Sequence, residues 1–422
     1  MEKQKKAGLG FRVADKISEL PDDIICIVLS FLSSRDATST SVLSPRWLDL
    51  WKHVTNLNFF DPSNNHILVK SERENDSWNS ETCKHVKMVN SALESHQALS
   101  LKQFRISFYV NKSAQSAIIK WLKFVWSRQV KRLDLNFWCD SREHAVVLGD
   151  SLGEMRPMKY LENLSVKMMK ISGEDISLFL RNCPFLRKLN ITTSFLTSEV
   201  HISGATLALE DLQIIGCSLR ESINICAPNL TIVCVDARPG KLWFKNVPRL
   251  AVATFEIRSP RYTMHDFASA LSCFTSQLHK LTLTLISHPN DDDDDVLIWQ
   301  KFLGKGFPQL PNLKELIVNH SCLLPVTHVI SACPRLQYFV FKFPYIDKEG
   351  TTDSRRFKRL EFKGSCSGNI IQSIRYISEN GAFQQIKTHS MSVDNRKGIC
   401  RQVELEFQVE LRYKGITCGL VC

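Results

Sequence analysis

Five consecutive carboxylates, Asp291 to Asp295, form the densest group of possible metal ligands in the sequence. Such a run could attract a divalent cation, but it lacks the alternating ligands and the glycine of a calcium-binding loop. Because like charges repel one another and stay hydrated, we expect a solvated surface loop here. The run therefore predicts no metal site.

Other sequence signatures of catalysis are missing as well. Lys305 lies between two glycines, but without the G-x-x-x-x-G-K spacing that cradles phosphates. None of the 12 histidines belongs to an H-E-x-x-H motif, and there is no G-x-S-x-G turn for a nucleophilic serine. The 14 cysteines include no C-x-x-C pair, which argues against a RING-type zinc site. We predict a non-enzymatic protein that needs no cofactor.

Composition bounds the class of protein. A chain of 422 residues is too long for one compact core and indicates two or three units, or an elongated array. It is 44% hydrophobic and 23% charged, as in a soluble folded protein. There is no apolar run of 18 residues, and the start M-E-K-Q-K-K lacks the apolar segment of a secretory signal. Cysteines in apolar surroundings, such as Cys234, fit a reducing compartment. We expect a cytosolic or nuclear protein without a membrane partner.

The net charge of +11 lies largely outside residues 15–60, in a part of the chain where two basic stretches stand out. These are Lys120, Lys123, Arg128, Lys131 and Arg132, and then Arg355, Arg356, Lys358 and Arg359. A basic surface favours acidic or phosphorylated partners or nucleic acid, but it also serves simply to keep a protein soluble. We favour the solubilising role.

The segment Asp15–Trp51 has the sequence of about three short helices with an excess of apolar side chains. Pro21 suits a first helical position, and Asp22 and Asp23 suit a first turn. Pro45, preceded by a capping Ser44, starts a later helix. In the first helix one apolar stripe contains Ile24, Ile27, Val28 and Phe31, and a second contains Ile25, Leu29 and Leu32. A helix that is apolar on most of its circumference is either buried in its own chain or docked on a partner.

The pattern L-P-D-D-I-I…I-V-L-S-F-L…R-D-A…S-V-L-S-P-R-W…L-W resembles an F-box. The resemblance implies docking on a Skp1-type adaptor in a cullin-based ubiquitin ligase. The implied docking set is Leu20, Pro21, Ile24, Ile27, Leu29, Leu32, Val42, Leu43, Arg46, Trp47 and Trp51. Pro45 departs from the lysine or arginine usual in the family, which removes one charge that could face an acidic adaptor.

After this segment one apolar triplet recurs, with the spacing L-x-x-L-x-L. It begins with Leu101/Phe104/Ile106, Val130/Leu133/Leu135, Leu161/Leu164/Val166, Leu186/Leu189/Ile191, Leu209/Leu212/Ile214 and Leu230/Val233/Val235. It continues with Leu250/Ala253/Phe255, Leu278/Leu281/Leu283, Leu313/Leu316/Val318, Leu336/Phe339/Phe341 and Phe357/Leu360/Phe362. Starts lie between 20 residues apart (Leu230 to Leu250) and 35 apart (Leu278 to Leu313). Most intervals are in or near the range of leucine-rich repeats, whose stacked units share one core.

Each triplet predicts a short strand whose alternate residues line a concave binding face. Segments 174–180 and 265–271 are predicted helices between strands. In the central repeats, segments 200–202, 223–225 and 242–244 alternate with period two and predict further strands on the convex side. Prolines at 184, 228, 248 and 334 precede the leucine of their repeat and support this register. An unrelated α/β fold is the alternative.

Taken together, the chain resembles plant F-box/leucine-rich-repeat proteins, and its last part is weakly similar to their FBD-type ending. We therefore predict an α/β protein with a three-helix F-box, an irregular solenoid and a C-terminal cap. The predicted division is a basic tail (1–14), F-box (15–60), linker and first repeat helix (61–98), solenoid (99–345) and FBD-like cap (346–422). Residues 403–411 predict a last strand within the cap.

The resemblance implies a substrate-recognition subunit of an SCF-type ubiquitin ligase, which would bind a Skp1-type adaptor, through it a cullin, and a target protein. One alternative is a small-molecule sensor. The other is a nucleic-acid-binding repeat protein that uses the basic stretches.

Overall fold

The computed structural model describes residues 16–17, 19–60, 75–110, 112–139, 142–149, 156–204, 207–218, 221–237, 242–258, 270–286, 307–319, 326–346, 352–363, 406–407 and 417–421. By compactness the chain divides into two units, Met1–Trp138 and Cys139–Cys422, and each is described by itself. The predicted loop Asp291–Asp295, the segment around Lys305 and the basic tail lie outside the described residues.

The first unit begins with short helices. They are α1 (Asp22–Leu29), α2 (Ser34–Ser39), η1 (Thr40–Val42), α3 (Pro45–Leu50) and η2 (Trp51–His53). Pro45 begins α3 as predicted, whereas Pro21 is the N-cap of α1 and not its first residue. Ser33 caps α2, because its Oγ accepts the backbone N–H of Asp36 at 3.1 Å. The three predicted helices are therefore confirmed, with the start of α1 displaced by one residue.

Three parallel strands follow, each backed by helical segments. The elements are β1 (Asn56–Phe60), α4 (Asn75–Ser95), β2 (Gln103–Tyr109), η4 (Lys112–Ala114), α5 (Gln115–Ser127) and β3 (Arg132–Trp138). Leu57 pairs with Phe104, and Phe104 pairs with Leu133, so the apolar triplets are aligned across the strands. The ring of Phe108 lies 5.8 Å from that of Phe137 and 5.7 Å from that of Trp121 on α5. These buried aromatic contacts form the core of the unit.

Strand β1 was not predicted. It carries the repeat's own apolar spacing at Val54, Leu57 and Phe59, all buried. Its strand partner is β2, and on the helical side the backbone N–H of Asn58 donates to Ser34 Oγ at 2.9 Å. The side-chain amide of Asn56 also donates to the carbonyl of Ser30 at 3.2 Å. The helices α1 and α2 thus supply acceptors to the first strand of the sheet.

The second unit contains a row of parallel strands. They are β5 (Asn163–Lys167), β7 (Lys188–Thr192), β10 (Asp211–Ile215), β12 (Ile232–Ala237), β14 (Val252–Arg258), β15 (Lys280–Ile286), β16 (Glu315–Asn319) and β17 (Tyr338–Ile346). Leu189, Leu212, Val233 and Ala253 lie side by side in register and are buried. Because each leucine position faces the equivalent residue of the next repeat, no repeat can bury its apolar face alone.

Proline turns set the start of several strands. The carbonyl of the residue before the proline accepts the N–H of the repeat's leucine. Leu186 donates to Cys183 in this way at 3.1 Å, and Leu336 donates to Cys333 at 3.0 Å. Two successive N–H groups then share one carbonyl of the preceding repeat, as Glu210 and Asp211 share that of Arg187. The predicted role of the prolines is confirmed, since the turn holds each leucine at the same place in its repeat.

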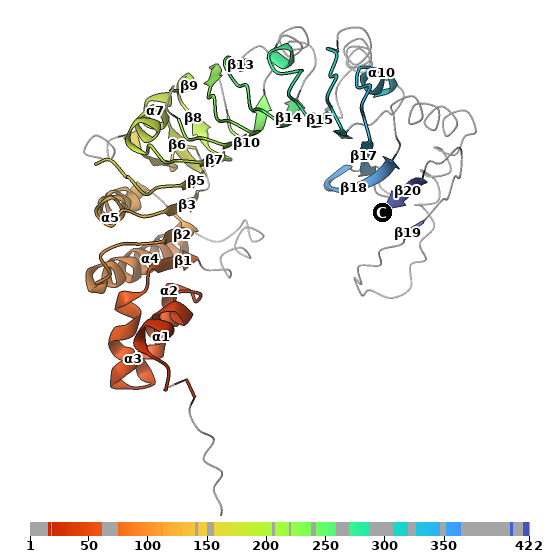
Figure 1. The fold of residues 1–422 in the computed structure, drawn as a ribbon. Coiled ribbons are helices and arrows are strands. Elements are labelled where there is room, and N and C mark those ends of the chain that lie inside the picture. Colours follow the sequence, from red (N-terminus) through yellow and green to blue (C-terminus); the bar gives the residue numbers. More distant parts are fainter. Residues whose placement is uncertain are drawn as a thin grey trace, which may run out of the picture. The chain divides into compact units, whose positions relative to one another are not determined.

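A second layer lies on one side of this row (Figure 1). It contains a helix, α7 (Gly173–Asn182), and the short strands β4 (Val146–Val147), β6 (Met169–Ile171), β8 (Phe195–Leu196), β9 (Val200–Ser203), β11 (Ile223–Cys226) and β13 (Leu242–Phe244). Strands β9, β11 and β13 form the predicted second sheet. The sheet of β4, β6 and β8 was not predicted, because two or three residues are too few for a recognisable alternation. The predicted helix at 174–180 is α7, with a capping box between Ser172 and Asp175.

The last described elements are α10 (Val326–Ser331), β18 (Thr352–Lys363), β19 (Glu406–Phe407) and β20 (Thr417–Val421). Strand β18 runs antiparallel to β17, with Phe362 opposite Phe339, and β20 runs antiparallel to β18. The prediction that Phe357, Leu360 and Phe362 form one more repeat is therefore wrong, because a repeat strand must be parallel to its neighbour. Of the predicted strand 403–411, only β19 is described, and most of the predicted helix 265–271 lies outside the described residues.

Candidate functional site

The two apolar stripes of α1 have different surroundings. Ile25 and Leu29 are each 1% exposed and belong to the core of the helical unit. The other stripe is open to solvent, and it contains Ile24, Ile27, Val28 and Phe31. Phe31 is 80% exposed, which is unusual for an aromatic side chain beside so many other apolar groups. The packing that folds α1 therefore uses one stripe and leaves the other free to contact a partner.

More exposed apolar side chains follow on the neighbouring segments. Val42 is 87% exposed, and Leu43 and Leu48 are exposed as well. Arg46 of α3 binds two residues at or just before the beginning of α1. Its Nη2 lies 2.6 Å from Asp22 Oδ1 and also donates to the carbonyl of Leu20. This pairing ties α3 to the beginning of α1. The helical unit thus presents one set of exposed apolar residues on elements that are held together.

We call these exposed residues the helical apolar surface. It consists of Pro21, Ile24, Ile27, Val28, Phe31, Leu32, Val42, Leu43 and Leu48. Of the docking set implied by the resemblance, Leu20 is half-buried and Pro21, Ile24, Ile27, Leu32, Val42 and Leu43 are exposed. Leu29 and Trp47 are buried, so their side chains hold this unit together instead of facing outward. Arg46 is engaged with its own chain, as described above.

Three members of the surface were missing from the predicted docking set, namely Val28, Phe31 and Leu48. A signal for two of them existed, because Val28 and Phe31 continue the stripe of Ile24 and Ile27 at helical spacing. The remaining predicted residue, Trp51, is half-buried and lines a hollow between α2 and α4. Its indole therefore faces a different region from the helical apolar surface.

Thiol chemistry is suppressed where the cysteines are buried. Burial, with a smaller effect of Asp22 and Asp23, raises the pKa of Cys26, whose thiol donates to the carbonyl of Leu50 at 3.4 Å. Burial raises the pKa of Cys183 and of Cys333 to about 12. These thiols stay protonated at neutral pH and are poor nucleophiles and metal ligands. Among the described residues, no three His, Cys, Asp or Glu side chains are grouped closely enough to hold a metal ion.

The strand face of the second unit is a second candidate surface. Ile232 and Val252 lie in register on β12 and β14, and Ile232 is exposed. Ion pairs lie on either side of them along the sheet, Lys188 with Asp211 at 3.5 Å and Lys280 with Glu315 at 2.7 Å. An apolar centre between charged residues is the arrangement found in many protein–protein interfaces. Within the described part of the chain, no helix has the length and hydrophobicity to cross a membrane.

An exposed apolar helical unit followed by parallel leucine-rich strands defines a protein with an F-box and a leucine-rich-repeat domain. Comparison with known families agrees. Residues 17–59 match the F-box domain, and residues 150–354 match the family described as At1g61320/AtMIF1, LRR domain. The chain thus has an F-box and a leucine-rich-repeat domain, and it is similar to plant F-box/FBD/LRR-repeat proteins.

Three relatives from Arabidopsis thaliana illustrate the similarity. F-box/FBD/LRR-repeat protein At1g13570 is 26% identical over 397 residues, which cover 82% of this chain and 87% of the relative. F-box/FBD/LRR-repeat protein At1g78750 is 26% identical over 353 residues, covering 78% and 70%. FBD-associated F-box protein At1g66310 is 24% identical over 369 residues, covering 80% and 72%. Each of these alignments thus covers most of this chain and most of the relative.

Proposed function

We propose that this protein is a substrate-recognition subunit of an SCF-type ubiquitin ligase. The F-box binds a Skp1-type adaptor and, through it, a cullin, while the repeats bind a target protein. The protein itself is not an enzyme in this proposal, and its contribution to ubiquitination is proximity between the target and a separate conjugating enzyme. It acts in the cytosol or the nucleus. The proposed domains are the F-box (15–60), a linker with the first repeat helix (61–98), the solenoid (99–345) and the FBD-like cap (346–422).

The helical apolar surface is the observation that carries the proposal. When a partner covers solvent-exposed aliphatic and aromatic side chains, the complex is stabilised by about 25 cal/mol for each Å² of apolar area removed from water. Phe31 and Val42, at 80% and 87% exposure, contribute little to the stability of the isolated chain by burial. Their burial by an adaptor is the role that accounts for them.

The strand face of the repeats is the proposed target site. Ile232 and Val252 supply an apolar centre, and the Lys188–Asp211 and Lys280–Glu315 pairs supply a charged rim. Parallel strands present these side chains on a rigid frame, so little conformational entropy is lost on binding.

A matched pair of variants tests adaptor binding. Val42 and Leu99 are equally exposed, at 87% each, but Leu99 lies outside the F-box and outside the helical apolar surface. We expect Val42→Asp with Leu43→Asp to abolish binding of a recombinant Skp1-type adaptor in a pull-down, while Leu99→Asp binds like the unaltered protein. Equal binding by all three proteins would refute the proposal. Circular dichroism of each variant checks that the helices remain folded.

A further inference from the structure

A recess lies between α2, β1 and α4. Its narrower part has a volume of about 290 Å³ and is lined by Trp51, Phe59, Met88 and Ala92 among others. Its wider part has a volume of about 680 Å³. Arg35, Phe59 and Met88 line both parts, so the two adjoin. These volumes are in the range of roughly 300–1,000 Å³ that small-molecule sites occupy.

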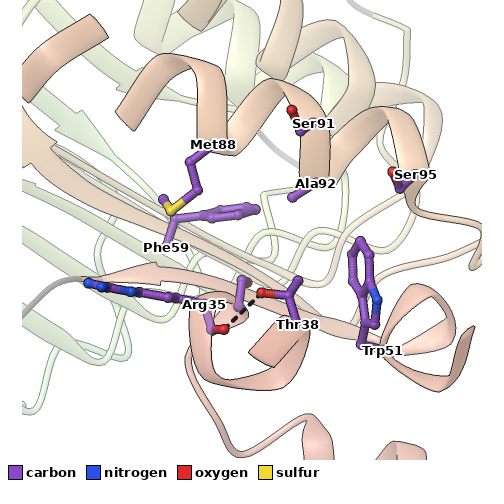
Figure 2. Close-up of a pocket in the computed structure, with 9 residues that line it drawn as sticks. Arg35, Thr38, Trp51, Phe59, Met88, Ser91, Ala92 and Ser95 are labelled. Carbon is purple, nitrogen blue, oxygen red and sulfur yellow. Dashed lines mark hydrogen bonds between the residues drawn. The ribbon is translucent and has the colours of Figure 1, made fainter. Parts of the chain in front are cut away.

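The narrower part is an apolar slot. Figure 2 shows Arg35 and Thr38 of α2 across from Ser91, Ala92 and Ser95 of α4, with Trp51 at one end. Phe59 and Met88 lie at the other end, in the direction of Arg35. A flat apolar body would contact an indole, a phenyl ring and a thioether here, and such contacts are favourable for aromatic ligands.

The wider part brings basic groups together. Arg35, Lys84 and His85 all line it, and His85 is stacked on Phe108 with 5.5 Å between ring centroids. One carboxylate, Asp36, is also present, with its Oδ2 accepting the hydroxyl of Ser33 at 2.8 Å, and the two cations Arg35 and Lys84 outweigh its single negative charge. Within the described residues, Arg35 and Lys84 have no carboxylate at ion-pair distance. The charge of this part is therefore suited to an anion.

We propose that the recess binds a small amphipathic anion, with an aromatic or aliphatic body in the narrow part and a carboxylate or phosphate beside Arg35 and Lys84. The planar guanidinium of Arg35 can pair with either group through two hydrogen bonds, and Lys84 adds a second positive charge. Arg35, which lines both parts, stands where the two halves of such a ligand would join. No residue of the helical apolar surface or of the strand face lines this site; of the docking set implied by the resemblance, Trp51 alone does.

The test uses the full chain and three probes with one ring system, namely 2-naphthoate, 2-naphthyl phosphate and the neutral 2-naphthamide. Binding is followed by ligand-observed NMR and calorimetry. We expect both anions to bind at least tenfold more tightly than the amide, and the better anion of the two identifies the preferred head group. The proposal is overturned if neither anion binds, or if the amide binds as well as the anions.

Variants on one helix separate a site from general charge attraction. Lys84 lines the recess, whereas Lys87 is an equally charged, exposed residue of α4 that does not. We expect Lys84→Gln and Arg35→Gln each to weaken binding of the anions about tenfold without changing binding of the amide, and Lys87→Gln to have no effect.

Ser91→Trp, at an exposed position that lines the narrow part, should block binding of all three probes while leaving the melting temperature unchanged. If Lys84→Gln and Lys87→Gln lost the same amount of affinity for the anions, binding would be non-specific charge attraction, and the proposed site would be overturned. Adaptor binding by these variants tests the proposed function independently.

Discussion

Gly173, the first residue of α7, faces the backbone of Glu199, the residue that precedes β9. A Cβ atom at position 173 would lie 1.8 Å from the Glu199 carbonyl oxygen, and 2.9 Å from its carbon. The backbone N–H of Gly173 also donates to Ser198 Oγ at 2.8 Å. Two successive repeats therefore approach so closely that only glycine fits between them.

Gly173→Ala is expected to destabilise the second unit. Backbone cannot move aside as a flexible side chain can, so the helix or the strand must shift, at a cost of at least about 1–3 kcal/mol. Urea unfolding followed by circular dichroism measures the loss. Gly149→Ala is the matched control, because a Cβ there would meet its nearest neighbour, Asp175 Oδ1, at an ordinary 3.6 Å. Equal midpoints for the two variants would contradict the prediction.

Phe31→Ala is expected to weaken adaptor binding without changing the stability of the chain. A central aromatic anchor in an interface contributes roughly 2 kcal/mol, which corresponds to about a 30-fold loss of affinity. Calorimetry with a Skp1-type adaptor gives the affinity, and a thermal melt gives the stability. Ile25→Ala, by contrast, should destabilise the chain itself, by about 2–5 kcal/mol of folding free energy, because Ile25 is in the core. A Phe31→Ala protein with unchanged affinity would remove Phe31 from the interface.

His96 is expected to make the first unit less stable in mild acid. Burial lowers the pKa of His96, although the hydrogen bond of its Nε2 with the Val54 carbonyl, at 2.9 Å, opposes this effect. The unfolded chain, with a pKa near 6.5 for this residue, then binds a proton more readily than the folded chain does. The contribution of neutral His96 is present above about pH 6.5 and is lost as the pH falls through that value.

Unfolding midpoints of the unaltered protein and of His96→Gln, compared from neutral pH downward, check this expectation. Glutamine retains a donor for the Val54 carbonyl but does not titrate. The variant should lose less stability than the unaltered protein as the pH falls. Parallel pH dependences would show that His96 does not titrate differently in the two states.

Alkylation should divide the cysteines by burial. The raised pKa values of Cys183 and Cys333, about 12 each, leave almost no thiolate at neutral pH. Cys83 and Cys273 are exposed. Iodoacetamide at neutral pH should therefore modify Cys83 and Cys273 well before Cys183 and Cys333, as read by peptide mass spectrometry, and all four should react in urea. Early modification of Cys183 in the folded chain would contradict the burial described here.

The repeat strands were predictable because the triplet spacing is itself the physical cause of the core. Leu133 and Leu135, for example, belong to the recurring triplet and are both buried in the core that the triplets build. Strand direction is not contained in that pattern, since inward and outward residues alternate equally in parallel and antiparallel strands. This is why Phe357, Leu360 and Phe362 were assigned to a repeat although β18 runs antiparallel.

The helical apolar surface was predictable only in part. Both stripes of α1 are equally apolar in sequence, so periodicity shows that two faces exist but does not show which one the chain covers itself. Burial of Leu29 and Trp47 depends on how α1, η1 and α3 meet, and this is a property of the tertiary structure. The recess beside Arg35 was beyond sequence reasoning for the same reason, because its walls come from elements far apart in the chain.

The acceptors that Ser30 and Ser34 offer to Asn56 and Asn58 have a practical consequence. An uncovered outer strand invites pairing with a neighbouring molecule and so promotes aggregation. Truncation of the chain before β1 would expose that strand along one side. Expression of the repeats without their amino-terminal helices should therefore yield self-associating material, and a recombinant fragment meant for target screening is best begun ahead of Asp22.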